Sequence, residues 1–197
     1  MTITSAGPDH SGTDEPVRLA VLIGSVRAGR HGPTVARWFT GEIAGRDEVA
    51  VDLVDLAEAD LPPGMDRDPD PGLGARLAAA DAFVVVTPEY NHSYPAGLKA
   101  AIDAFHAEWV AKPVGFVSYG GRSGGIRAVE HLRTVFVELH GVPVRDAVSL
   151  PDYWTLFDDD GALTDEATTQ ATRVLTDQLV WWGRVLREAR SRHGQLV

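Results

Sequence analysis

The sequence predicts a single α/β domain with a doubly wound, parallel, five-stranded sheet. Residues Phe83 to Val86 form an unbroken apolar run, which is typical of a strand covered by helices on both faces. Five runs of strand character alternate with segments of helical character, and this alternation favours a parallel sheet. A chain of 197 residues that is 44% hydrophobic can bury a sizeable core within one domain.

The predicted elements follow one another as this architecture requires. Strands are expected at residues 17–24, 49–54, 82–86, 113–118 and 142–150. Helices are expected at residues 33–44, 73–80, 95–110, 125–140 and 165–192, the first of them with Gly32 and Pro33 at the Ncap and N1 positions. Residues 56–71 contain four prolines and a glycine, which predicts a loop, and Asp160-Gly161 predicts a turn. Periodicity leaves the strand order open among the common orders, one of which is 2-1-3-4-5.

Composition predicts the limits of the domain and excludes several functional classes. Residues 1–16 are acidic and polar, so we expect a disordered tail before a domain at 17–192, and a second tail at 193–197. The absence of cysteine excludes disulfides, thiolate metal sites and thiol catalysis, and fits a cytoplasmic protein. A net charge of −10 argues against nucleic-acid partners, and no segment approaches the roughly 20 apolar residues of a membrane span.

The turn after the first strand, residues 24–34, has the composition of a phosphate-binding loop. It precedes a helix whose N-terminal N–H groups favour an anion. Ser25 and Thr34 add hydroxyls to this turn, and Arg27, Arg30 and His31 add charge. The Lys-Ser/Thr pair of a P-loop is missing, and so is the spacing GxGxxG. We therefore expect a phosphate monoester here; the alternative is a glycine-rich connector with solvated arginines.

Polar and aromatic residues follow the third strand. Pro88, Glu89, Tyr90 and Asn91 lie where a parallel sheet binds ligands, beyond the carboxyl end of a buried strand. Each of them alone is compatible with packing or with an exposed surface. Their clustering before a helix that opens at Pro95 predicts a binding site whose backbone pairs with the edge of a flat heterocycle.

The turn after the fourth strand, residues 118–125, contains four glycines that let the backbone approach a planar ligand. It also contains Gly121-Arg122-Ser123-Gly124-Gly125, which matches the GxSxG turn of serine hydrolases. A hydrolase based on Ser123 is therefore an alternative function, with Asp152 and His193 as its nominal partners. His193 lies in a polar tail, and the histidines of the following helix are badly placed to act as the base.

Together these turns resemble the NADPH-dependent FMN reductase family of flavodoxin-like proteins. The resemblance rests on GSVRAGRHGPTVA (24–36), TPEYNHSYPAGLKAAID (87–103) and SYGGRSGGIRAVEHLR (118–133), and it covers about residues 17–150. It implies the strand order 2-1-3-4-5 and an FMN site. The implied FMN contacts are, for the phosphate, Ser25, Arg27, His31, Gly32, Pro33 and Thr34 and, for the ring, Pro88, Glu89, Tyr90, Asn91, Ser118, Tyr119, Gly120 and Gly121.

The resemblance also implies a reaction. NADPH reduces the bound flavin, which passes electrons to a small acceptor such as free flavin, a quinone, or an azo or nitro compound. No catalytic side chain is required. We expect backbone N–H groups of residues 89–91 and 120–121 to tune the ring, and Arg122 to bind the 2′-phosphate of NADPH. A non-enzymatic FMN electron carrier and a binding module without flavin are the further alternatives.

Family members pair as dimers or dimers of dimers, so the resemblance implies a homodimer. The surface expected to pair includes Ile102, Phe105, His106 and Trp109, with an ordinary intrachain core as the alternative. Trp181 and Trp182 are adjacent on the last helix and point about 100° apart, so we expect only one of them to pack on the sheet.

Overall fold

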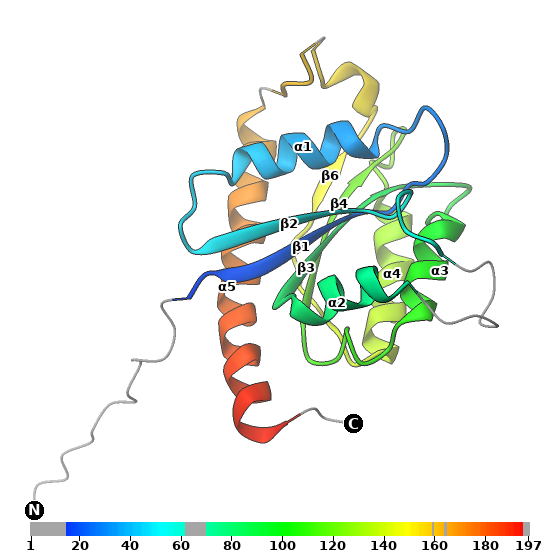
Figure 1. Cartoon of the computed structure of the whole chain (residues 1–197). Coiled ribbons are helices and arrows are strands. Elements are labelled where there is room, and N and C mark those ends of the chain that lie inside the picture. The colour runs from blue at the N-terminus through cyan, green and yellow to red at the C-terminus, as the bar shows by residue number, and fades with distance from the viewer. Residues whose placement is uncertain (1–14, 62–69, 159, 164, 195–197) are drawn as a thin grey trace, which may run out of the picture.

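The computed structural model describes residues 15–61, 70–158, 160–163 and 165–194 and has the predicted architecture (Figure 1). Its parallel sheet has the order β2-β1-β3-β4-β5, and β6 also pairs with β4. This arrangement confirms the order 2-1-3-4-5. The strands are β1 (Val17–Ile23), β2 (Val49–Asp55), β3 (Ala82–Pro88), β4 (Pro113–Tyr119), β5 (Val142–Pro143) and β6 (Val148–Leu150). The helices are α1 (Gly32–Glu42), α2 (Pro71–Ala79), α3 (Ala96–Ala104), α4 (Ile126–Glu138), the 3-10 turn η1 (Tyr153–Thr155) and α5 (Glu166–His193).

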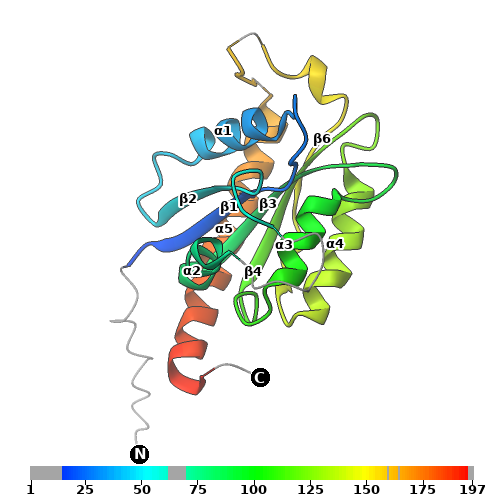
Figure 2. The same ribbon diagram turned by 45° about the vertical axis from the view of Figure 1, so that its right-hand side comes forward.

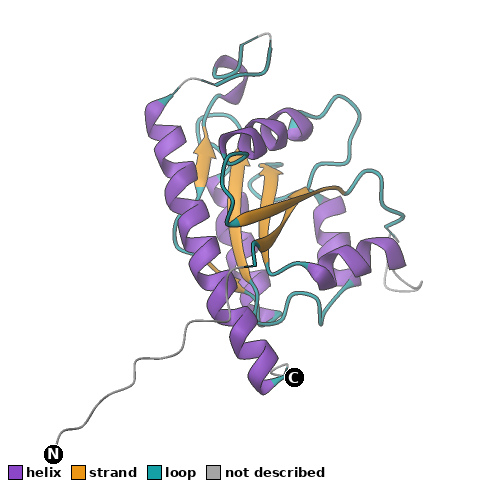
Figure 3. Cartoon of the chain, turned by 60° about the vertical axis from the view of Figure 1, so that its left-hand side comes forward, coloured by secondary structure: helices purple, strands orange, loops and turns teal. Residues whose placement is uncertain are grey.

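Two helical layers enclose the sheet, and each has its own hydrophobic core. Helices α1 and α5 cover one face, where Phe39 and Leu179 pack on residues of β1 and β3. Helices α2, α3 and α4 cover the other face, where Trp109 and Phe136 contribute large buried side chains. Figure 2 shows α3 and α4 opposite α5, and Figure 3 shows the strands between the two layers. Strand β3 is buried along its whole length, as its apolar run predicts.

The predicted strand at 142–150 is broken in two, which corrects the prediction of five strands. Of this segment, only β5 and β6 pair with β4, the first at its beginning and the second at its end. Between them, Arg133 donates to the backbone carbonyls of Val144 and Arg145, and Asp146 pairs with Gln178 of α5. Pro143 has no N–H to offer a ladder. These polar contacts replace strand pairing in the middle of the segment.

Helix α3 is shorter than predicted and ends at Ala104. The indole Nε1 of Trp109 donates to the carbonyls of Ile102 (3.2 Å) and Phe105 (2.9 Å). These carbonyls at the end of the helix are therefore bonded by a side chain and not by the N–H groups of a further helical turn. Ile102, Phe105 and Trp109 are buried within this chain. Of the surface expected to pair, only His106 is exposed, and the alternative of an intrachain core is correct for the other three.

The ends of the other elements differ from the predictions by no more than two residues. His31, not Gly32, is the N-cap residue of α1. Helix α5 continues to His193, and its N-cap Asp165 accepts a hydrogen bond from the N–H of Thr168. Trp182 is half-buried against the core while Trp181 is exposed, as the 100° spacing predicts. None of the described helices is long and apolar enough to span a membrane. The predictions for residues 1–14, 62–69 and 195–197 lie outside the described residues.

Candidate functional site

Side chains and backbone groups join the three predicted turns at the carboxyl edge of the sheet. Nε of Arg27 donates to the hydroxyl of Tyr90 at 2.7 Å, which links the first turn to the second. The hydroxyl of Tyr119 lies 3.3 Å from Oγ of Ser25, which links the first turn to the third. The N–H of Glu89 donates to the carbonyl of Tyr119 at 3.1 Å and links the second turn to the third. The three turns therefore form one connected surface.

The first turn is built around a buried hydroxyl. Ser25 is fully buried, and a Cβ on Gly32 would clash with its Oγ and lie 2.7 Å from Cγ2 of Ile23. Only glycine therefore allows the start of α1 to approach Ser25 this closely. Burial raises the pKa of Tyr119, so its phenol keeps the proton that it donates to Ser25.

The basic residues of the first turn have different partners. Arg30 forms an ion pair with Asp55, the last residue of β2, at 2.5 Å, and this carboxylate neutralises its charge. Arg27 is exposed and has no carboxylate partner among the described residues. The ring of His31 stands edge-on to Tyr153, with 5.0 Å between the ring centroids. Thr34, in the first turn of α1, is half-buried.

The second turn is a two-residue reversal. Tyr90 and Ser93 exchange both backbone hydrogen bonds, at 2.8 and 3.0 Å, and Asn91 and His92 between them have φ values of 48° and 73°. Two consecutive left-handed residues are the pattern of a type I′ turn. The turn exposes Asn91 and leaves Tyr90 half-buried beside Arg27.

The side chain of Glu89 points into the protein. Its carboxylate accepts hydrogen bonds from Ser123 at 2.9 Å and from the backbone N–H of Arg127 at 3.3 Å, and it forms an ion pair with the Arg127 guanidinium at 2.5 Å. Burial raises the pKa of Glu89, but hydrogen bonds from Arg127 and Ser123 outweigh it and the net pKa is lowered. The ionised carboxylate of Glu89 therefore links the second turn to Ser123 of the third turn and to Arg127 of α4.

This contact also bears on the serine hydrolase alternative. The hydroxyl of Ser123 donates to a carboxylate, whereas a serine nucleophile must donate to a histidine base. The nominal base, His193, is the last residue of α5, and Asp152 has a left-handed backbone (φ 43°) that starts η1. Neither residue is bonded to Ser123 among the described contacts, and nothing supports hydrolase chemistry at this turn.

Hydrogen bonds to one backbone carbonyl hold the third turn in place. Oγ of Ser118 and Oγ of Ser149 both donate to the carbonyl of Gly124, at 2.7 and 3.0 Å. Gly124 and Gly125 have φ values of 58° and 85°, a conformation that other residues rarely adopt. Arg122 is exposed at the tip of the turn.

The hydrogen bonds correct part of the expected N–H donor set. The N–H groups of Glu89, Tyr90 and Gly120 already donate within the protein, to the carbonyls of Tyr119, Ser93 and Leu150. Among the described residues, the N–H groups of Asn91 and Gly121 have no partner. Two of the five expected donors are therefore available to a ligand.

Sequence reasoning missed the segment after β6, which joins the same edge. Tyr153 lies edge-on to both His31 and Tyr119, with centroid distances of 5.0 and 5.1 Å, and its N–H is 3.4 Å from the carbonyl of Gly120. Trp154 is 60% exposed beside Gly121. A Tyr-Trp pair just beyond the last strand of a parallel sheet was the signal that could have revealed them.

The described residues contain no cluster of His, Asp and Glu suited to a metal ion. A cavity of about 320 Å³ lies between the start of α1 and the segment after β6, and it includes His31 and Thr34. Of the other predicted site residues, Arg27, Asn91 and Arg122 are exposed. Five are buried: Ser25, Gly32, Pro88, Ser118 and Tyr119. All fifteen predicted contacts lie at one edge of the sheet, and the carboxylate of Glu89 is turned inward to Ser123 and Arg127.

Comparisons with known proteins identify the family of the chain. The NADPH-dependent FMN reductase family matches residues 17–155. The chain is 40% identical over 149 residues to the NAD(P)H-dependent FMN reductase C4B3.06c of Schizosaccharomyces pombe, covering 68% of this chain and 74% of that protein. It is 32% identical over 176 residues to the FMN-dependent NADPH-azoreductase of Staphylococcus haemolyticus, covering 81% and 92%.

A solved structure adds the fold. The flavoenzyme FerB, an NAD(P)H:(acceptor) oxidoreductase from Paracoccus denitrificans, superposes with a TM-score of 0.64 at 26% identity, over 85% of this chain and 97% of that one. The match to the family spans the strands β1 to β6 and the three turns that meet at their carboxyl edge. The chain therefore belongs to the NADPH-dependent FMN reductase family and is an FMN-dependent NAD(P)H oxidoreductase with a flavodoxin-like fold.

Proposed function

We propose that FMN binds across the three connected turns, with its phosphate at the first turn and its ring between the second and the third. The observation that carries this proposal is the set of contacts that joins the turns, from Arg27 to Tyr90, from Ser25 to Tyr119 and from Glu89 to Tyr119. The proposed contacts are Ser25, Arg27, His31, Gly32, Pro33, Thr34, Pro88, Glu89, Tyr90, Asn91, Ser118, Tyr119, Gly120 and Gly121.

The donors of the first turn fit a phosphate monoester. The start of α1 supplies the positive end of a helix dipole, and the Ser25 hydroxyl lies under it where a Cβ on Gly32 would collide. The charge on Arg27 has no carboxylate to neutralise it among the described residues, whereas Arg30 is already paired with Asp55. Arg27 is therefore the basic residue of this turn that we assign to the phosphate.

The second and third turns fit the edge and the face of a flat ring. The N–H groups of Asn91 and Gly121 are the donors that we assign to the ring edge. Tyr90, which is half-buried, supplies an aromatic wall, and the contacts of Glu89 with Ser123 and Arg127 fix the separation of the two turns. Bound FMN would supply the redox chemistry, with two electrons entering as hydride from the nucleotide and leaving to the acceptor, while the residues of this chain would orient the ring and leave one face accessible.

We assign NADPH as the donor, with Arg122 at its 2′-phosphate, and a small molecule as the acceptor. Arg122 is exposed at the tip of the third turn, without a carboxylate partner among the described residues. Free flavin, quinones, azo dyes and nitro compounds are the acceptor classes, and an azoreductase among the relatives favours the azo class. We further propose a homodimer in the cytoplasm, because family members pair and the chain has no cysteine.

The test is an absorbance spectrum of the purified protein reconstituted with FMN, followed by NADPH under anaerobic conditions. We expect flavin bands that bleach on addition of NADPH without any partner protein. Flavin that stays oxidised would indicate an electron carrier instead, and a protein that takes up no FMN would refute the site.

Two variants make the assignment specific. Arg27→Met is expected to raise the dissociation constant of FMN about tenfold, since a charge-assisted hydrogen bond to phosphate contributes about 1.5 kcal/mol. Arg122→Ala is expected to leave FMN binding unchanged and to reduce the preference for NADPH over NADH. Light scattering at micromolar concentration tests the homodimer, and a monomer would refute it.

A further inference from the structure

The cavity between α1 and the segment after β6 has an aromatic lining, of which only His31 belongs to the proposed FMN contacts. Its volume is about 320 Å³, and its aromatic walls come from His31, Tyr153, Trp154 and Phe157. Figure 1 shows the segment after β6, drawn in yellow and gold, next to the start of α1. Trp154 is 60% exposed, which is unusual for the largest side chain in proteins.

The walls of this cavity are fixed by packing within the chain. Tyr153 is held between His31 and Tyr119, and Phe157 stands edge-on to Trp38 at a centroid distance of 6.2 Å. Trp154 rests edge-on against Tyr153, with 5.3 Å between the centroids. A preformed aromatic surface of this kind binds a planar ring without the cost of ordering its own side chains.

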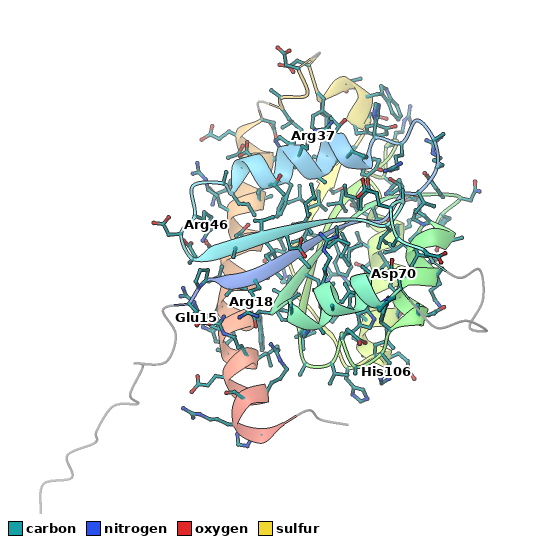
Figure 4. All side chains as sticks on the ribbon, in the orientation of Figure 1. Glu15, Arg18, Arg37, Arg46, Asp70 and His106 are labelled. Atoms are coloured by element: carbon teal, nitrogen blue, oxygen red, sulfur yellow. The ribbon has the colours of Figure 1, made fainter. Side chains whose placement is uncertain are left out.

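The charges of the lining select the kind of ring. Asp158 and Asp160 are acidic, and Arg37 is the basic residue, at the edge of α1 that faces this segment (Figure 4). Two carboxylates against one guanidinium make these charges of the lining net negative, which disfavours an anionic aromatic such as a sulfonated dye. Carboxylate oxygens accept hydrogen bonds, so an uncharged planar ring with an amino donor fits best.

The cavity also lies at a fixed place relative to the proposed FMN site. It shares His31 and Thr34 with the proposed phosphate turn. At its other end, a Cβ on Gly121 would lie 3.8 Å from the ring of Trp154, so Trp154 stands beside the turn that carries Arg122. A ligand in the cavity is therefore next to the flavin site and next to the proposed 2′-phosphate contact.

From these observations we propose that the cavity binds the adenine ring of the pyridine nucleotide, stacked on Trp154. Adenine is uncharged, planar and carries an amino donor, and its ribose would then lie beside the turn of Arg122. This inference rests on the proposed function, because the nicotinamide end of the same molecule must reach the flavin. It makes Trp154 a residue that determines affinity for the dinucleotide and not for FMN.

The test measures binding without electron transfer. NADP⁺ is titrated calorimetrically into the FMN-loaded, oxidised protein, as wild type, Trp154→Ala, Trp154→Phe and Trp181→Ala. Trp154→Ala is expected to raise the dissociation constant of NADP⁺ by about 5- to 150-fold, the range found when alanine replaces an aromatic side chain that stacks on a nucleic-acid base. Trp154→Phe should retain most of the affinity. Trp181, which is 58% exposed on α5, is the matched control and should have no effect.

A truncated donor separates this inference from the proposed function. Reduced nicotinamide mononucleotide lacks adenine, so it should reduce the flavin at the same rate in wild type and in Trp154→Ala. An unchanged dissociation constant of NADP⁺ in Trp154→Ala would overturn the adenine site while leaving the FMN site intact. Equal losses with the truncated donor, or a change in KM for the acceptor alone, would also overturn it. Failure of the wild type to bind FMN would instead refute the proposed function.

Discussion

Lys112 makes the stability of this protein depend on pH in a predictable direction. It is 4% exposed at the start of β4, and its Nζ donates to the carbonyls of Leu77 (2.8 Å) and Ala78 (2.9 Å) near the end of α2. Burial, followed by the charge of Arg190, lowers its pKa from 10.5 to about 8, although Asp81 opposes the shift. The ammonium is therefore costly in the folded state.

The sign of the effect follows from proton binding. Between pH 8 and 10.5 the unfolded lysine holds a proton that the folded lysine has released, so the free energy of unfolding rises with pH. The full gain in unfolding free energy is present above pH 10.5, and it is lost as the pH falls through about 8. The two pKa values correspond to about 3 kcal/mol in total, of which about 2 kcal/mol falls between pH 7 and 10.

The assay compares denaturant unfolding of wild type and Lys112→Met at pH 7, 8, 9 and 10. The difference in unfolding free energy should shift by about 2 kcal/mol in favour of wild type as the pH rises, because methionine cannot titrate. Lys99→Met is the control, since Lys99 is 41% exposed and pairs with Asp103 on the surface of α3. A difference that stays constant with pH, or a pKa of Lys112 near 10.5 by NMR, would refute the reasoning.

Three further substitutions test the site and the fold. Gly32→Ala should lower stability by about 1–3 kcal/mol and weaken FMN binding, since its Cβ would collide with Ser25, whereas Gly41→Ala on the same helix meets nothing within 4 Å and should be neutral or stabilising. Glu89→Ala should raise the FMN dissociation constant about tenfold, because the carboxylate that joins the second turn to Ser123 and Arg127 is lost. Titration followed by flavin fluorescence measures this constant. Asp165→Ala should lower stability by about 1 kcal/mol in thermal unfolding, because α5 loses its N-cap acceptor; an unchanged midpoint would contradict this role.

The elements that a single periodicity defines could be predicted from the sequence. The fully buried strand β3 and the 28-residue helix α5 are long or uniform enough that local pattern decides their structure. Strand order was predictable only through the family resemblance, since order depends on which edges pair and not on the pattern within each strand.

The parts that could not be predicted depend on individual side chains that bond to backbone carbonyls 4 to 12 positions away in the sequence. Arg133 captures the carbonyls of Val144 and Arg145 and interrupts the fifth strand, although the segment has strand character. The indole of Trp109 ends α3 early, although the helical pattern continues. In both places a side chain donates to a backbone carbonyl that a backbone N–H would otherwise bond. The helix or strand propensity of the neighbouring residues does not reveal such a contact.

The candidate site divides in the same way. Its three turns could be located, because parallel strands deliver their carboxyl ends to one edge and the glycines, prolines and aromatics there are visible in the sequence. The direction of each side chain could not: the Glu89 carboxylate turns inward to Arg127, a residue 38 positions away. A polar residue at the right edge is therefore evidence for the site, but its role requires the partner to be known.

Charge placement connects the site to its anionic ligands. The chain carries a net charge of −10, and arginines such as Arg30, Arg46 and Arg76 are neutralised by carboxylates. Arg27 and Arg122, on the proposed FMN and nucleotide edge, have no such partner among the described residues. Other arginines for which the described residues supply no carboxylate partner, such as Arg37 and Arg173, lie on the helices, so an unpaired charge alone does not locate a phosphate site. What sets Arg27 and Arg122 apart is their position in turns beyond the carboxyl ends of β1 and β4, where a parallel sheet binds its ligands. Net charge alone would argue against anionic ligands, whereas the pairing of individual arginines, read together with their place on the sheet, argues for anionic ligands at this edge.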